Sequence, residues 1–177
     1  LILAVVLSYG FTNMRHIREK EYTISTVKQI SNYRIALLTD LHYDTIQDKE
    51  VVREMVDHVQ AQKPDLVILG GDIVEEGTSQ ESMEEIFRIL GGMESTYGVY
   101  YVYGNHDRQP YTEDRTYTEE ELDQAIESSG IQILKDRYVE IGDDLILAGR
   151  DDAASPRGTA RKKGTRSFTC GFRIPGR

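Results

Sequence analysis

Residues 99–107 have the sequence Val-Tyr-Tyr-Val-Tyr-Gly-Asn-His-Asp, an apolar run that stops on a glycine followed by three polar side chains. A run of β-branched and aromatic residues of this kind predicts a buried strand that carries functional groups at its end. Two earlier runs have the same form: residues 34–39 lead into Asp40-Leu41-His42, and residues 65–69 lead into Gly70-Gly71-Asp72. Because ligands collect outside the carboxyl ends of strands in open α/β sheets, the three strand ends predict one shared site.

The segments between these strands have the spacing of amphipathic helices. Apolar residues recur at helical spacing over residues 48–62, 78–91 and 118–130, and Thr78 with Glu81 and Thr118 with Glu121 fit capping boxes. The predicted strands are residues 22–27, 34–39, 65–69, 98–103, 131–134, 138–141 and 145–148, with a hairpin turn at Gly142-Asp143. Strands that first alternate with helices and then follow one another predict an α/β fold with a mixed sheet flanked by helices.

The composition is that of a single globular domain, with 177 residues of which 39% are hydrophobic and 29% charged. Residues 157–177 carry 7 of the 21 basic residues and none of the 30 acidic ones, so the rest of the chain is strongly acidic. An acidic body argues against nucleic acid as a partner and suits a site for divalent cations. Cys170 is the single cysteine, which excludes an intramolecular disulfide and a cysteine-rich zinc site.

The N-terminal residues suggest a membrane attachment. Residues 1–12 begin with seven apolar residues, fewer than the roughly 20 that cross a bilayer, and we expect them to be the last part of a membrane anchor. A buried strand is the alternative. Residues 13–21 contain Arg15, Arg18 and Lys20, which form a basic juxtamembrane flank. By the positive-inside rule we expect a cell membrane-associated protein with its domain on the cytoplasmic side.

The patterned part of the sequence ends before the C-terminus. We expect the domain to cover residues 22–155, because helical and strand periodicity is lost after Ser155. The basic tail, residues 156–177, is expected to be a disordered or non-native end. A functional basic arm is the alternative.

The polar residues at the strand ends are of the types that bind divalent metals. Asp40 and His42 lie two positions apart, so both side chains project to the same side of an extended chain and can hold one metal. Asp72 follows two glycines, which allow a tight turn, and its two oxygens can bridge two cations. Asn105 can complete the second metal site. Two ions about 3.5–4 Å apart would clamp a phosphate and activate a bridging water.

His106 cannot easily point the same way as its neighbour Asn105, so we predict that it protonates the leaving alcohol. Asp107 is predicted to orient the His106 imidazole and to raise its pKa toward neutrality. Each motif has a structural alternative, since Asp-x-His and Gly-Asp occur in turns and Asn-His-Asp fits an Asx-rich loop. Three such motifs in order, each after an apolar strand, favour metal chemistry.

The motifs Asp40-Leu41-His42, Gly71-Asp72 and Gly104-Asn105-His106-Asp107 resemble the first three motifs of the calcineurin-like metallophosphoesterases, over about residues 22–155. The chain is most similar to the bacterial membrane-associated branch, which includes proteins related to the UDP-2,3-diacylglucosamine hydrolases. That similarity includes residues 38–42, the apolar N-terminus and residues 147–152.

This resemblance implies a four-layer α/β/β/α sandwich with two divalent ions, which can be Mn, Fe, Zn or Mg. It implies that Asp40 and His42 bind the first metal, Asp72 bridges, Asn105 binds the second and His106 assists the leaving group. The implied activity is hydrolysis of a phosphomonoester or phosphodiester, and a nucleotide-linked lipid is one candidate substrate. Glu75 stands where relatives often have an aspartate and is not predicted to be a ligand.

One departure from the family pattern concerns histidine. Family members supply further histidine ligands from later motifs, one of the Gly-His-x-His type, whereas none of the four histidines of this chain follows His106. His58 and His16 are not expected to replace them. We therefore expect a chain truncated at its C-terminus. The alternatives to an enzyme are a catalytically incomplete chain that binds one metal weakly and, less favoured, a membrane-tethered interaction module.

Overall fold

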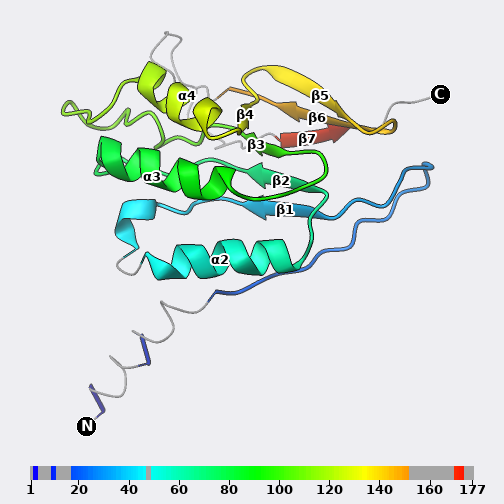
Figure 1. Cartoon of the computed structure of the whole chain (residues 1–177), viewed down its shortest axis with the longest axis horizontal. Helices are drawn as coiled ribbons and strands as arrows, with labels where there is room; N and C mark the ends of the chain where they lie inside the picture. Colours follow the sequence, from blue (N-terminus) through cyan, green and yellow to red (C-terminus); the bar gives the residue numbers. More distant parts are fainter. Residues whose placement is uncertain (1, 4–8, 11–16, 47–48, 152–169, 174–177) are drawn as a thin grey trace.

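The computed structural model describes residues 2–3, 9–10, 17–46, 49–151 and the backbone of 170–173. Its main elements are β1 (Ile35–Leu38), the 3₁₀ turn η1 (Tyr43–Thr45), α2 (Glu50–Ala61), β2 (Leu66–Leu69), α3 (Gln80–Gly91), β3 (Val99–Tyr101), α4 (Glu119–Ser128), β4 (Gln132–Ile133), β5 (Arg137–Ile141), β6 (Leu145–Gly149) and β7 (Cys170–Arg173) (Figure 1). The predicted α/β class is confirmed.

The strands form two sheets. One contains β1, β2, β3 and β4 in that order, all parallel, and the other contains β5, β6 and β7, all antiparallel. The predicted mixture of parallel and antiparallel strands is therefore present and is divided between the two sheets. The hairpin predicted at Gly142-Asp143 joins β5 to β6.

The parallel sheet has a separate hydrophobic core on each face. Val67 and Leu69 of β2 face the first core, together with the apolar sides of α3 and α4, whereas Leu66 and Ile68 face the second core, which also contains residues of β5 and β6. Successive side chains of a strand point to opposite faces, so a central strand with both faces covered needs a continuous apolar run. The described residues thus form three layers: helices, parallel sheet and antiparallel sheet (Figure 1).

One of the two predicted capping boxes is confirmed, and the other is wrong. Thr118 and Glu121 form the predicted capping box of α4. For α3 the prediction was wrong by one residue, because the N-cap is Ser79, whose side chain accepts from the amide of Ser82. The Thr78 hydroxyl instead accepts from the amide of Glu75 at 3.0 Å. Thr78 therefore closes the turn that leads away from the end of β2.

The strand predicted at residues 22–27 is wrong. These residues are described and form no strand, and Tyr22, Ile24 and Val27 are exposed. Alternation of apolar and polar residues allows a strand, but a strand also needs a neighbouring edge to supply its hydrogen bonds. The chain just before this segment contacts α2, where Glu19 Oε1 lies 3.0 Å from His58 Nδ1.

Several predictions fall largely outside the described residues. The membrane anchor and its basic flank include residues 1, 4–8 and 11–16, and the basic tail includes residues 156–169 and 174–177, all of which lie outside the described residues. No helix in the described segments is long and apolar enough to cross a membrane. Within the predicted tail, Cys170–Arg173 are described and form β7, which pairs with β6.

We predict that Leu69→Ala lowers the free energy of unfolding by about 2–5 kcal/mol, because it leaves a cavity in the helix-side core. Leu69 is completely buried in β2, whereas Leu37 of the edge strand β1 is 64% exposed. The matched control Leu37→Ala should therefore cost less than about 1 kcal/mol. Urea unfolding followed by circular dichroism measures both. Equal losses would contradict the assignment of Leu69 to the core.

Candidate metal centre

The ends of the first three strands bring the predicted site residues together. Because β1, β2 and β3 are adjacent and parallel, the segments that follow them leave the sheet at the same edge, beside η1 and the start of α3 (Figure 1). One ligand atom from each of Asp40, His42 and Asp72 lies within 4.8 Å of the other two. Asp40 is exposed, His42 is half-buried and Asp72 is buried. Three side chains predicted to bind metal thus form one compact group.

All three of these residues have a left-handed backbone. The φ angles are 55° at Asp40, 45° at His42 and 50° at Asp72. This region is sparsely populated by residues other than glycine, and such conformations concentrate at functional sites. Main-chain hydrogen bonds between the two loops hold them, since the amide of Asp40 donates to the carbonyl of Gly71 and the amide of His42 donates to that of Asp72, each at 3.0 Å. The ligands are therefore held by the backbone and not only by their own contacts.

Two glycines allow the loops after β2 and β3 to touch. A Cβ atom on Gly71, where φ is 83°, would overlap the main chain of Gly104, and a Cβ on Gly104 would overlap the carboxylate and amide of Asp72. Neither position can therefore hold a side chain without movement of the backbone. This close approach sets Asn105 and His106 beside Asp72.

Asp107 is the anchor of both loops. It is completely buried, and its carboxylate accepts hydrogen bonds from the amides of Asp72, Ile73, Val74 and Gly104 at 2.9, 2.9, 3.2 and 2.6 Å. Burial raises the pKa of this carboxyl, while the amides, Gly104 first, oppose that effect. Asp107 was predicted to orient the His106 imidazole. The amides of both loops converge on its carboxylate, which fixes the distance between the loops, and the orienting role stays a prediction.

Glu76 is the carboxylate that contacts the His106 ring. His106 Nδ1 lies 2.7 Å from Glu76 Oε2, and the main-chain amide of His106 donates to Asp72 Oδ1 at 2.9 Å. Burial lowers the pKa of His106, but the hydrogen bond and charge of Glu76 raise it, and the net shift is upward. The His106 and His42 rings are 5.4 Å apart between centroids. His106 therefore adjoins the metal group and is oriented by a carboxylate.

Sequence reasoning missed Glu76 and gave Glu75 no role. Glu75 Oε2 lies 3.1 Å from His42 Nδ1, so the two consecutive glutamates each contact one histidine of the site. The signal in the sequence was an acidic pair directly after the apolar residues that follow Asp72, in the loop before α3. A carboxylate on the far nitrogen of a histidine is the usual way to fix a ligating or catalytic imidazole.

The other predicted residues are placed as follows. Asn105 is half-buried, between Gly104, which abuts Asp72, and His106, which donates to Asp72. His58 is on α2, where it is exposed and pairs with Glu19. His16 lies outside the described residues.

The residues present fit a divalent cation. Two carboxylates and an imidazole are the donors that Mn, Fe, Zn and, through oxygen, Mg accept. Glu76 Oε1 is also buried and has no hydrogen-bond partner among the described residues. Asp40, Asp72, Glu75 and Glu76 concentrate negative charge that a cation would balance.

Comparison with known proteins agrees with this geometry. A family profile described as calcineurin-like phosphoesterase matches residues 33–170. The chain therefore belongs to the calcineurin-like phosphoesterase family. Its α/β fold and the group of Asp40, His42 and Asp72 agree with the family that the sequence motifs resemble.

Three relatives show how much of a longer protein this chain matches. It is 36% identical over 88 residues to an uncharacterized metallophosphoesterase of Helicobacter pylori, which covers 50% of this chain and 23% of that protein. It is 27% identical over 161 residues to an uncharacterized metallophosphoesterase of Aquifex aeolicus, covering 89% and 58%. It is 30% identical over 104 residues to a phosphodiesterase of Escherichia coli, covering 58% and 36%. The chain thus matches between about a quarter and three fifths of each relative.

We predict that Asp107→Asn lowers the free energy of unfolding by about 1–3 kcal/mol, because the amide nitrogen would face main-chain donors where a charged acceptor stood. Asp143, exposed in the turn between β5 and β6, supplies the control Asp143→Asn, which should change it by less than about 0.5 kcal/mol. Chemical denaturation measures both. An Asp107 variant as stable as the wild type would favour the orienting role first predicted for this residue.

Proposed function

We propose that this chain carries the first half of a dinuclear phosphoesterase centre that hydrolyses a phosphomonoester or phosphodiester. Asp40 and His42 would hold the first ion, Asp72 would be shared between the two ions, and Asn105 would contribute to the second. The observation that carries the proposal is the compact group of Asp40, His42 and Asp72 at the ends of adjacent parallel strands. The ions are divalent: Mn, Fe, Zn or Mg.

Bound ions would lower the pKa of a water and stabilise charge on the phosphoryl oxygens. The residues of this chain act on the leaving group. Because Nδ1 of His106 faces Glu76, Nε2 is the atom that donates a proton to the leaving oxygen. Glu76 acts as a positioning residue, which fixes the ring and stabilises its charged form. The main-chain amide of His106 donates a hydrogen bond to Asp72, and this bond keeps the proton donor beside the proposed bridging ligand.

The proposal extends to substrate and location. The Escherichia coli relative is named a phosphodiesterase, which makes a diester the first substrate to assay, and a nucleotide-linked lipid remains a candidate. The acidic body disfavours nucleic acid as a partner. Association with the cell membrane on its cytoplasmic side rests on the apolar N-terminus and the basic residues that follow it.

We predict that the protein retains divalent metal and hydrolyses bis(p-nitrophenyl) phosphate or p-nitrophenyl phosphate in the presence of Mn²⁺. Asp72→Asn should abolish metal retention and turnover together, because it removes charge from the bridging ligand. His106→Asn should retain the metal and lose about 10²–10⁴-fold in turnover of an alkyl ester such as a benzyl phosphate, whose leaving alcohol needs a proton, and less on the p-nitrophenyl esters. The matched control is His58→Asn, on the exposed face of α2, which should match the wild type.

Metal content, measured by elemental analysis after gel filtration, separates the alternatives. One ion or none, without turnover of either ester, would support the catalytically incomplete chain. Equal activities of the His106 and His58 variants on the alkyl ester would remove His106 from the mechanism. Chelation with EDTA should abolish turnover, and added Mn²⁺ should restore it.

We predict that Glu76→Gln lowers turnover about 10–100-fold with unchanged metal content, as is typical for a residue that orients an imidazole. Glu127→Gln, at an exposed position of α4, is the control and should have no effect. Nitrogen-15 NMR of the histidine rings distinguishes orientation from a general structural role. The tautomer and pKa of His106 should change in the Glu76 variant only, and an unchanged His106 spectrum would contradict the assignment.

A further inference from the structure

Tyr111 is an exposed aromatic residue beside the candidate proton donor. Its ring centroid is 5.3 Å from that of His106, with an angle of 58° between the planes. The residue is nonetheless 56% exposed. A tilted ring pair at this distance is a favourable aromatic contact. Tyr111 therefore presents free ring surface to solvent next to the site.

The segment that carries Tyr111 is held at both ends. Gln109, completely buried with φ of 50°, donates from its side chain to the carbonyls of Thr78 and Glu75 at 3.0 and 3.1 Å. Its side-chain oxygen accepts from the amide of Thr116 at 2.8 Å, and the Tyr117 hydroxyl donates to the carbonyl of Asp107 at 3.0 Å. The loop is therefore fastened to the turn after β2, which also carries Glu75 and Glu76.

The loop between residues 109 and 117 thus combines buried anchors with an exposed aromatic residue, Tyr111. Core packing does not require the ring, because more than half of it is exposed. The ring pairs directly with the imidazole that would deliver the proton. A group attached to an oxygen that His106 protonates would therefore lie within reach of Tyr111.

We propose that Tyr111 is a specificity-determining residue that stacks on a flat ring in the leaving alcohol of the substrate. The inference rests on the proposed function, because His106 defines the leaving-group side. The substrate class is a phosphoester whose leaving oxygen is close to an aromatic ring, either an aryl-substituted alcohol or a nucleoside. Stacking on an exposed aromatic side chain tolerates any ring with a π face, so the selection is for flatness and not for one base.

The test compares benzyl and cyclohexylmethyl phosphate esters, used as monoester or diester according to the class that the protein hydrolyses. The two leaving alcohols have similar size and acidity and differ in flatness. Wild-type protein should prefer the benzyl ester about tenfold in kcat/KM, the size of one aromatic contact. Tyr111→Ala should remove that preference by slowing the benzyl ester alone, and Tyr111→Phe should retain it.

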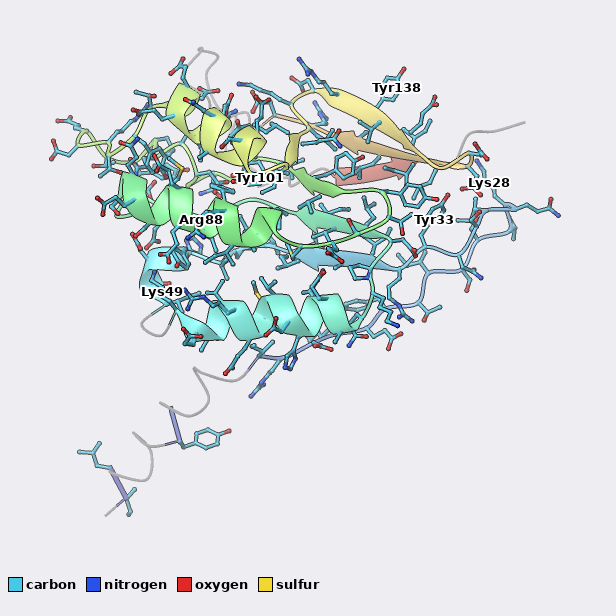
Figure 2. The ribbon with its side chains drawn as sticks, in the orientation of Figure 1. Lys28, Tyr33, Lys49, Arg88, Tyr101 and Tyr138 are labelled. Carbon is cyan, nitrogen blue, oxygen red and sulfur yellow. The ribbon has the colours of Figure 1, made fainter. Side chains whose placement is uncertain are left out.

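Tyr138 provides the matched control. It is 67% exposed on β5, over the antiparallel sheet (Figure 2). Tyr138→Ala should leave both esters unaffected. A second readout needs no turnover: benzylphosphonate should bind the Mn²⁺-loaded wild-type protein about tenfold more tightly than cyclohexylmethylphosphonate, and Tyr111→Ala should equalise the two. Isothermal titration calorimetry measures these affinities.

The outcomes separate the two proposals. A wild-type protein that hydrolyses both esters with a ratio unchanged in Tyr111→Ala would overturn the role of Tyr111 and leave the phosphoesterase intact. Equal losses on both esters would also overturn it, because they indicate a structural role. If neither ester is hydrolysed, the proposed function fails, and the phosphonate affinities alone then decide whether Tyr111 selects a flat ring.

Discussion

The carboxylate of Asp107 is the interaction on which the rest of the site depends. Four main-chain amides from two separate loops converge on one buried side chain. Each loop is the continuation of a different strand, so this one group determines how far Asp72 lies from His106. Hydrogen bonds to a charged acceptor are stronger than those between neutral groups, and here they replace regular structure where the sheet ends.

The four carboxylates of the site have two different sets of partners. Glu75 and Glu76 each lie against the ring of one histidine, His42 and His106, while Asp40 and Asp72 retain oxygens that can face an ion. The two glutamates thus orient the histidines, and the two aspartates remain for a cation. The net charge of the whole chain is also negative, and a negative potential would concentrate divalent cations at this edge of the sheet.

The parts of the structure that follow from local pattern could be predicted from the sequence. The runs before Asp40, Asp72 and Gly104 mark central strands, because a strand buried on two faces must be apolar throughout. Their parallel order then brings the three motifs together. Contacts that depend on the path of a loop could not be predicted. The glutamate that reaches His106, and the amides that reach Asp107, are set by how two loops fold over each other.

Errors in the fold have a similar origin. Residues 22–27 have the alternation of a strand but find no neighbouring strand among the described residues. Thr78 and Ser79 are adjacent hydroxyl residues, and which one caps α3 depends on the geometry of the turn that precedes it. Periodicity and residue type describe what a segment can do, whereas pairing and capping also depend on its neighbours.

The left-handed backbone of Asp40, His42 and Asp72 has an evolutionary consequence. Glycine adopts this conformation more easily than aspartate or histidine, so at each position the residue that is best for metal chemistry is not the best for folding. Selection for stability alone would favour glycine at these positions, and the metal ligands would be lost. A lineage that keeps all three residues is therefore one in which cation binding at this edge of the sheet continues to be selected.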